Sequence, residues 1–299
     1  MADDDKYPTE TGRRRFVKGV VGAGVLAGVG TGAAAALGTA TAPTGSGGGI
    51  TEFVGIENTD GPAPRGMPVI PVQIADNGDI QGLWPEVKTV EEAGQSFEVA
   101  ETDLGGVTYS SEWFQYCGVQ TYAGIQPSAD QENTFLSAAD SPYEWQSEEL
   151  SEGDPLNVSH FEDYENFDTG VGSPGLGKPA MATWRSQDVD AAETIPVQVV
   201  RSDEVIKMRQ EGGPLGEFIK AATTEDGFMA WLDKCTHFCC VPAFKAYEDS
   251  AKFGAADEVY CQCHQSVYAP FTWVQKSFVA LPRPEGEDGG GGGGGGNES

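Results

Sequence analysis

The most informative parts of this sequence are two short boxes, Cys235-Thr236-His237-Phe238-Cys239-Cys240 and Cys261-Gln262-Cys263-His264-Gln265-Ser266. Together they hold five of the six cysteines and two of the three histidines of a 299-residue chain. Each box offers a thiolate and an imidazole at short spacing, as C-x-H in the first box and C-x-x-H in the second. Two thiolates and two imidazoles satisfy either a tetrahedral zinc ion or a two-iron cluster with histidines on one iron. The ligand types alone leave both alternatives open.

Two features of the boxes go beyond what a four-ligand zinc site needs. Spare cysteines remain in both boxes, Cys240 in the first and Cys263 in the second, and in an exported protein a surplus pair favours a disulfide between the two loops. The second box is followed by the polar residues Ser266 and Tyr268, for which a simple zinc motif gives no reason. Both features favour the iron–sulfur alternative.

With their flanking residues, the two boxes resemble the cluster-binding boxes of Rieske proteins, specifically the iron–sulfur subunits of quinol–cytochrome c reductases in cytochrome bc complexes. The resemblance extends over about residues 195–284, under a third of the chain. It implies one [2Fe-2S] cluster per chain, with the metal ligands Cys235, His237, Cys261 and His264, the cysteines on one iron and the histidines on the other.

The same resemblance implies a second set of contacts around the cluster. Cys240 and Cys263 are expected to form a disulfide across the two loops. Ser266 and Tyr268 match positions that donate hydrogen bonds to a cluster sulfide and to a cysteine sulfur. The segment Ala280–Pro284 resembles the proline-containing loop that covers the third side of the cluster.

The chain also departs from the family pattern. Cys239 stands where glycine is usual, and Gln262 and Gln265 replace the usual proline and glycine of the second box. Glycine is normally kept where φ is positive or where backbone comes close, so these positions bear on loop geometry. Cys117 lies outside the boxes, and the sequence leaves it either a buried thiol or a partner of Cys239.

The fold class expected from the sequence is all-β. The composition has 41 Gly and 18 Pro, and short apolar runs at residues 69–74, 97–100 and 107–109 are separated by turn signals. The family resemblance implies a Rieske-type antiparallel β-sandwich with a cluster-binding subdomain, about residues 233–270, inserted into a base domain.

The N-terminus carries an export signal and a candidate membrane anchor. The run Arg13–Lys18 resembles the twin-arginine signal, and residues 19–42 contain no charged side chain. As a helix, this segment would be about 36 Å long, enough for a hydrocarbon core of about 30 Å. A small-residue cleavage site ends at Ala42, but Pro43 directly after it hinders cleavage, so we expect a retained anchor.

The expected organisation follows from these segments. In chain order it comprises a cytoplasmic n-region (1–18), a transmembrane anchor or signal h-region (19–42), a flexible linker (43–49), a β-rich extension of unknown role (50–194), a Rieske domain (195–285) and a disordered Gly-rich tail (286–299). The positive-inside rule places the head on the extracytoplasmic side of the cell membrane.

The expected function is that of an electron-transfer subunit of a quinol–cytochrome c reductase-type oxidoreductase. Histidine ligands raise the potential of a two-iron cluster, to about −150 to +300 mV against about −400 mV with cysteines alone. The imidazoles of His237 and His264 are expected to face quinol and to couple the electron to a proton. Implied partners are a di-haem cytochrome b-type membrane subunit and a cytochrome or blue-copper acceptor.

Two alternatives and one exclusion accompany this expectation. The boxes also suit the Rieske small subunit of an exported molybdenum oxidoreductase of the arsenite-oxidase type, or a zinc-stabilised surface binding module. With 18 Lys and Arg against 46 Asp and Glu, the formal net charge is −28. That charge repels polyanions at long range, so nucleic acid is excluded as a partner.

Overall fold

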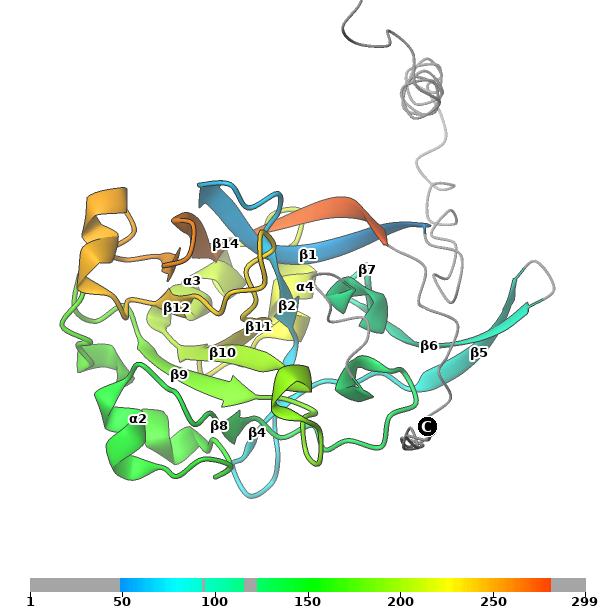
Figure 1. Cartoon of the computed structure of the whole chain (residues 1–299), viewed down its shortest axis with the longest axis horizontal. Helices are drawn as coiled ribbons and strands as arrows, with labels where there is room; N and C mark the ends of the chain where they lie inside the picture. The colour runs from blue at the N-terminus through cyan, green and yellow to red at the C-terminus, as the bar shows by residue number, and fades with distance from the viewer. Residues whose placement is uncertain (1–48, 93–94, 116–122, 281–299) are drawn as a thin grey trace, which may run out of the picture. The chain divides into compact units, whose positions relative to one another are not determined.

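Antiparallel β-sheet dominates the computed structural model, which describes residues 49–92, 95–115 and 123–280 (Figure 1). The largest sheet has nine strands, and every pairing within it is antiparallel. In spatial order these are β12 (Ala243–Phe244), β13 (Val259–Cys261), β14 (Ser266–Ala280), β1 (Gly49–Asp60), β2 (Met67–Ile70), β11 (Phe228–Leu232), β10 (Pro196–Arg201), β9 (Lys178–Thr183) and β8 (Leu136–Ser137). The all-β expectation is confirmed at this level.

Two smaller sheets and a few short helices complete the described residues. The smaller sheets are formed by β3 (Val72–Ile74) with β4 (Ile80–Gly82), and by β5 (Val87–Glu92), β6 (Gln95–Leu104) and β7 (Val107–Ser110). The α-helices are α2 (Glu144–Glu149), α3 (Asp203–Glu211) and α4 (Gly216–Ala222). The 3-10 turns are η1 (Ser111–Phe114), η3 (Ala123–Ile125), η4 (Val158–Phe161), η5 (Tyr164–Asn166), η6 (Ala191–Glu193) and η7 (Glu248–Phe253).

Local sequence explains where these elements begin and end. All five residues of β11 are buried, as an uninterrupted apolar run predicts for a central strand. The predicted strand at residues 69–74 divides into β2 and β3 at Pro71, which has no N–H for a sheet hydrogen bond. Helix α3 begins after Ser202, whose Oγ accepts a 3.1 Å bond from the Glu204 N–H, and it ends at Gly212 with φ 73°.

The extension and the predicted Rieske segment share the nine-stranded sheet. Strands β1, β2, β8 and β9 come from residues 50–194, and β10 to β14 come from residues 195–285. β1 lies between β14 and β2, with Gly49 opposite Ala280 at one end of the β1–β14 pair (Figure 1). The N-terminal strands therefore form part of the same core as the strands that carry the two boxes.

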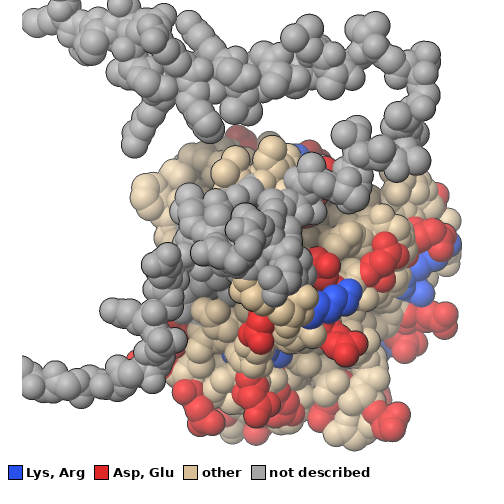
Figure 2. Space-filling model, turned by 90° about the vertical axis from the view of Figure 1, so that its right-hand side faces the viewer, with Lys and Arg blue, Asp and Glu red and all other residues tan. Residues whose placement is uncertain are grey.

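Several sequence-based expectations concern segments outside the described residues, namely the export signal, the anchor at 19–42, nearly all of the linker, and the tail. Within residues 49–92, 95–115 and 123–280, no helix is long and apolar enough to cross a membrane. On the face drawn in Figure 2, acidic side chains outnumber basic ones, as the net charge predicts.

Candidate metal centre

The two boxes occupy neighbouring loops of the nine-stranded sheet. The first box follows β11 and leads to β12, while the second forms the tight turn between β13 and β14. In that turn Cys261 pairs with Ser266, and the Gln265 N–H donates to the Cys261 carbonyl at 2.9 Å. Because β13 pairs with both β12 and β14, the sheet fixes the two loops beside each other.

The glycine replacements lie where the backbone is left-handed. Cys239 has φ 61° and Gln265 has φ 62°. In this region a side chain with a Cβ costs roughly 1–2 kcal/mol, which is why glycine is favoured there. Cys239 and Gln265 therefore adopt the turn geometry of their loops at a cost in conformational free energy.

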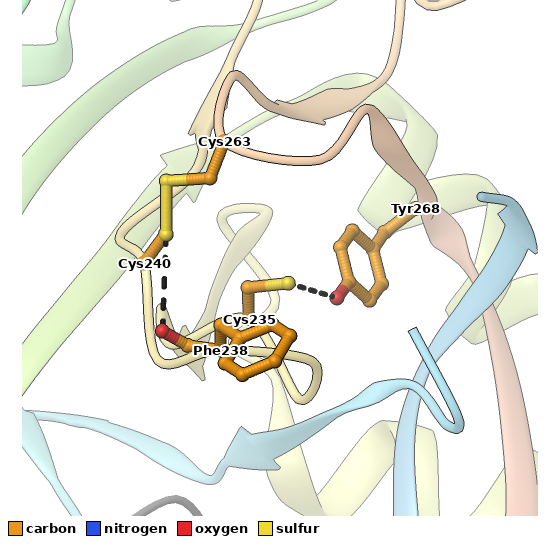
Figure 3. The surroundings of a disulfide bond; sticks show 5 residues. All are labelled: Cys235, Phe238, Cys240, Cys263 and Tyr268. Carbon is orange, nitrogen blue, oxygen red and sulfur yellow. Dashed lines mark hydrogen bonds between the residues drawn. A yellow bond between two sulfur atoms is a disulfide. The ribbon is translucent and has the colours of Figure 1, made fainter. Parts of the chain in front are cut away.

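A disulfide joins the two loops, as expected. Cys240 and Cys263 are bonded, with their Cα atoms 6.6 Å apart (Figure 3). Cys239 is also disulfide-bonded. Cys117, which the sequence offered as its partner, lies outside the described residues.

Cys235 and Cys261 carry the thiols of the site, and both are buried. The hydroxyl of Tyr268, itself fully buried, donates a 3.1 Å hydrogen bond to the Cys235 Sγ (Figure 3). A hydrogen bond from the Cys261 thiol, supported by those from Tyr268 and Ser266, lowers the pKa of Cys235 to about 5 against the opposing effect of burial. The pKa of Cys261 is raised because it holds the proton that the pair shares, and because it is buried. Such a pair presents one thiolate, the form that binds metal.

The two histidines of the boxes face each other. The ring centroids of His237 and His264 are 4.7 Å apart, with the rings nearly perpendicular. His237 is half-buried, and its Nδ1 is buried without a hydrogen-bond partner, whereas His264 is exposed. A buried imidazole nitrogen with no partner is costly unless it binds something, such as a metal ion.

An apolar side chain flanks both imidazoles. The ring of Phe238 lies 4.4 Å from that of His237 and 5.1 Å from that of His264, centroid to centroid. Phe238 is nevertheless 65% exposed, and the nearby Val241 is 44% exposed. Exposed aromatic surface beside two imidazoles suits contact with an apolar molecule or partner.

A proline-containing loop that sequence reasoning missed packs against both boxes. It is Gly61–Gly66, between β1 and β2. The Ala63 N–H donates to the Ser266 Oγ at 3.2 Å, and the Thr236 Oγ1 donates to the Arg65 carbonyl at 2.6 Å. Gly61 has φ 84°, and a Cβ there would lie 2.6 Å from the backbone carbonyl oxygen of Gln265. We call Gly61–Gly66 the cover loop.

The sequence leads us to expect a covering loop of this kind at Ala280–Pro284, and that expectation stays a prediction. Ala280 is the last residue of β14, and residues 281–284 lie outside the described part of the chain. The signal for the cover loop was present as Gly61-Pro62-Ala63-Pro64, about 170 residues before the first box. It could be recognised only once β1 was known to pair with β14.

A buried carboxyl beneath the first box is a further residue that the sequence did not reveal. Asp233 is completely buried, and its Oδ1 accepts a 3.2 Å bond from the Trp231 indole. Burial raises the pKa of Asp233 well above its usual range, and the neighbouring Cys235 thiolate adds to this, although the indole bond opposes it.

The structure thus brings together the predicted residues Cys235, His237, Cys261, His264, Ser266 and Tyr268. Ser266 accepts from the cover loop and hydrogen-bonds to Cys235, a cysteine sulfur. Another grouping of potential metal ligands is Cys240, Cys261 and Cys263, but the disulfide leaves only Cys261 with a thiol. The paired thiols and the unpartnered His237 Nδ1 fit a group bound between the boxes.

Comparisons with known proteins add no further information on this site. No protein-family model, no curated protein and no solved structure matches the chain.

Proposed function

We propose that the chain is a Rieske-type electron-transfer subunit that takes electrons from quinol at the outer membrane face. The observation that carries the proposal is the arrangement of two thiols and two imidazoles on loops joined by the Cys240–Cys263 disulfide. The all-β class of the fold also supports the proposal.

In this proposal Cys235 and Cys261 hold one iron of a [2Fe-2S] cluster, and His237 and His264 hold the other. When bound, the cluster supplies a one-electron acceptor whose potential is raised by the neutral imidazoles. Tyr268 donates its hydrogen bond to the Cys235 sulfur, which stabilises added negative charge.

Substrate contact in the proposal is made by the exposed part of the site. His264 is exposed, so a ring nitrogen left free by the metal would be able to accept the proton released by a quinol hydroxyl. Phe238 offers its exposed ring as an apolar surface for the quinol. A membrane subunit of the di-haem cytochrome b type would supply the rest of the quinol pocket, and a cytochrome or small copper protein would accept the electron.

An optical redox titration of the purified protein tests the proposed role. A midpoint potential within about −150 to +300 mV is expected, because quinol oxidation needs an acceptor of this kind. A potential near about −400 mV, typical of all-cysteine clusters, would contradict the proposal. The variant His264→Ala should lose its iron, whereas His160→Ala, which changes a histidine outside the two boxes, should keep it.

A further inference from the structure

Three cysteine sulfur atoms lie together where the two boxes meet. The Sγ atoms of Cys240, Cys261 and Cys263 are all within 4.8 Å of one another. Cys240 and Cys263 form the disulfide drawn in Figure 3, whereas Cys261 carries a thiol. A thiol is therefore held close beside a disulfide. We call these three residues the sulfur trio.

We propose that the sulfur trio is a thiol–disulfide exchange site in the iron-free chain. The Cys261 thiol passes its proton to the paired Cys235 thiolate, the Cys261 sulfur attacks the Cys240 Sγ, a Cys240–Cys261 bond forms, and the Cys240–Cys263 bond breaks. The electron pair of the broken bond leaves on the Cys263 Sγ. One disulfide is exchanged for another, so the step needs no oxidant or reductant.

Proximity favours this reaction. Exchange proceeds by direct attack of a thiolate on a disulfide sulfur, and its rate depends on access between the two groups. Reactants held within one folded chain reach effective concentrations far above those of solution thiols. Cys261 is fully buried, but the attack is internal and needs no approach from solvent.

Exposure of the leaving group selects Cys240 as the atom attacked. Attack on Cys240 releases a thiolate on Cys263, which is exposed and can be hydrated. Attack on Cys263 would instead release a thiolate on the half-buried Cys240, where desolvation penalises the charge. It would also join residues only two apart in the β13–β14 turn, whereas Cys240 and Cys261 are separated by 261 − 240 = 21 residues, close to the native 23.

The exchange has a consequence for assembly, and here the inference rests on the proposed function. Cys261 is a proposed iron ligand, and its lone pair cannot both bind iron and attack a disulfide. Iron binding therefore protects the native disulfide, whereas exchange before loading removes a ligand. Whether iron binding or disulfide exchange comes first therefore decides whether the chain can bind the cluster.

Disulfide mapping of the iron-free chain tests the inference. The full chain, stripped of metal by a chelator, is held at pH 8 without added thiol or oxidant and quenched in acid. It is then denatured, labelled with N-ethylmaleimide and digested. The Cys240–Cys261 peptide should appear over time, most of the label should shift from Cys261 to Cys263, and the total label per chain should stay constant.

Two variants serve as controls. Cys235→Ser removes the other thiol of the site but leaves the sulfur trio intact, so the label should still shift. Cys261→Ser removes the attacking atom, so the Cys240–Cys263 disulfide should persist. Label that stays on Cys261 in the iron-free chain would overturn the inference, as would a shift of label to Cys240.

The result can be separated from the fate of the proposed function. Iron-loaded chain should retain the native disulfide under the same conditions. A chain that never binds iron but shifts its label would refute the proposed function and support the exchange. A chain that binds iron but shows no exchange after the iron is removed would support iron binding by the boxes and refute the exchange.

Discussion

The phenolic hydroxyl of Tyr268 donates a 3.1 Å hydrogen bond to the Sγ atom of Cys235. Tyr268 lies in β14, 33 residues beyond Cys235, and its ring is completely buried. The relationship links the strand that follows the second box to a ligand of the first. Through this contact a buried side chain of the sheet acts directly on a proposed metal ligand.

Replacing Tyr268 with Phe removes this donor and keeps the ring. One hydrogen bond is worth about 1–1.5 kcal/mol, which corresponds to roughly 40–65 mV for one electron. We expect Tyr268→Phe to retain its iron and to lower the midpoint potential by this amount in a redox titration. Tyr164→Phe, whose hydroxyl bonds Asp203 away from the boxes, should leave the potential unchanged. An unaltered potential in Tyr268→Phe would show that the bond does not affect the centre.

The cover loop provides a matched pair of glycine variants. Gly61 and Gly106 both have φ 84°, but a Cβ meets backbone of the second box at Gly61 and open space at Gly106. Gly106→Ala should cost about 1 kcal/mol from backbone strain alone. Gly61→Ala should cost roughly 1–3 kcal/mol more through collision, measured by denaturant unfolding, and should speed iron loss. Equal losses of unfolding free energy in the two variants would mean that the cover loop does not pack closely against the second box.

The state of Cys239 can be checked by peptide mapping. Cys239 is disulfide-bonded, Cys240 pairs with Cys263, and Cys235 and Cys261 carry thiols. We therefore expect Cys239 to take no maleimide label in the denatured, non-reduced chain and to take it after reduction. Label on Cys239 without reduction would refute the bond.

Glu258 is expected to make stability depend on pH. Burial, with repulsion from Asp257, raises its pKa from 4.5 to about 7. Between these values the folded state binds more protons than the unfolded state, so the free energy of unfolding falls as pH rises and levels off above about 7. After allowance for solvent screening, the loss is about 1–2 kcal/mol.

Glu258→Gln isolates this contribution because it keeps the shape and removes the titration. The variant should match the parent chain near pH 4.5 and exceed its free energy of unfolding at pH 8, as measured by urea denaturation. A difference that is the same at both pH values would contradict the assignment.

The sequence signals for the candidate centre are local. The ligand spacing, the spare cysteines and the polar residues of the second box all lie within 34 residues, from Cys235 to Tyr268. The structure brings these residues together, and the Cys240–Cys263 disulfide is confirmed. The left-handed backbone at Cys239 and Gln265 also follows from the glycine positions they replace.

What the sequence did not predict depends on contacts distant along the chain. The cover loop reaches the boxes because β1 pairs with β14 in a register that places Gly49 opposite Ala280. No local pattern encodes a pairing across more than 200 residues. For the same reason, the contribution of β1, β2, β8 and β9 to the sheet that carries the boxes was not apparent.

The central claim is that two cysteines and two histidines bind a [2Fe-2S] cluster, and low-temperature electron paramagnetic resonance of the reduced protein tests it most directly. We predict the low average g-value typical of mixed histidine and cysteine ligation, with two iron and two sulfide per chain. Stoichiometric zinc with no iron signal would contradict the account.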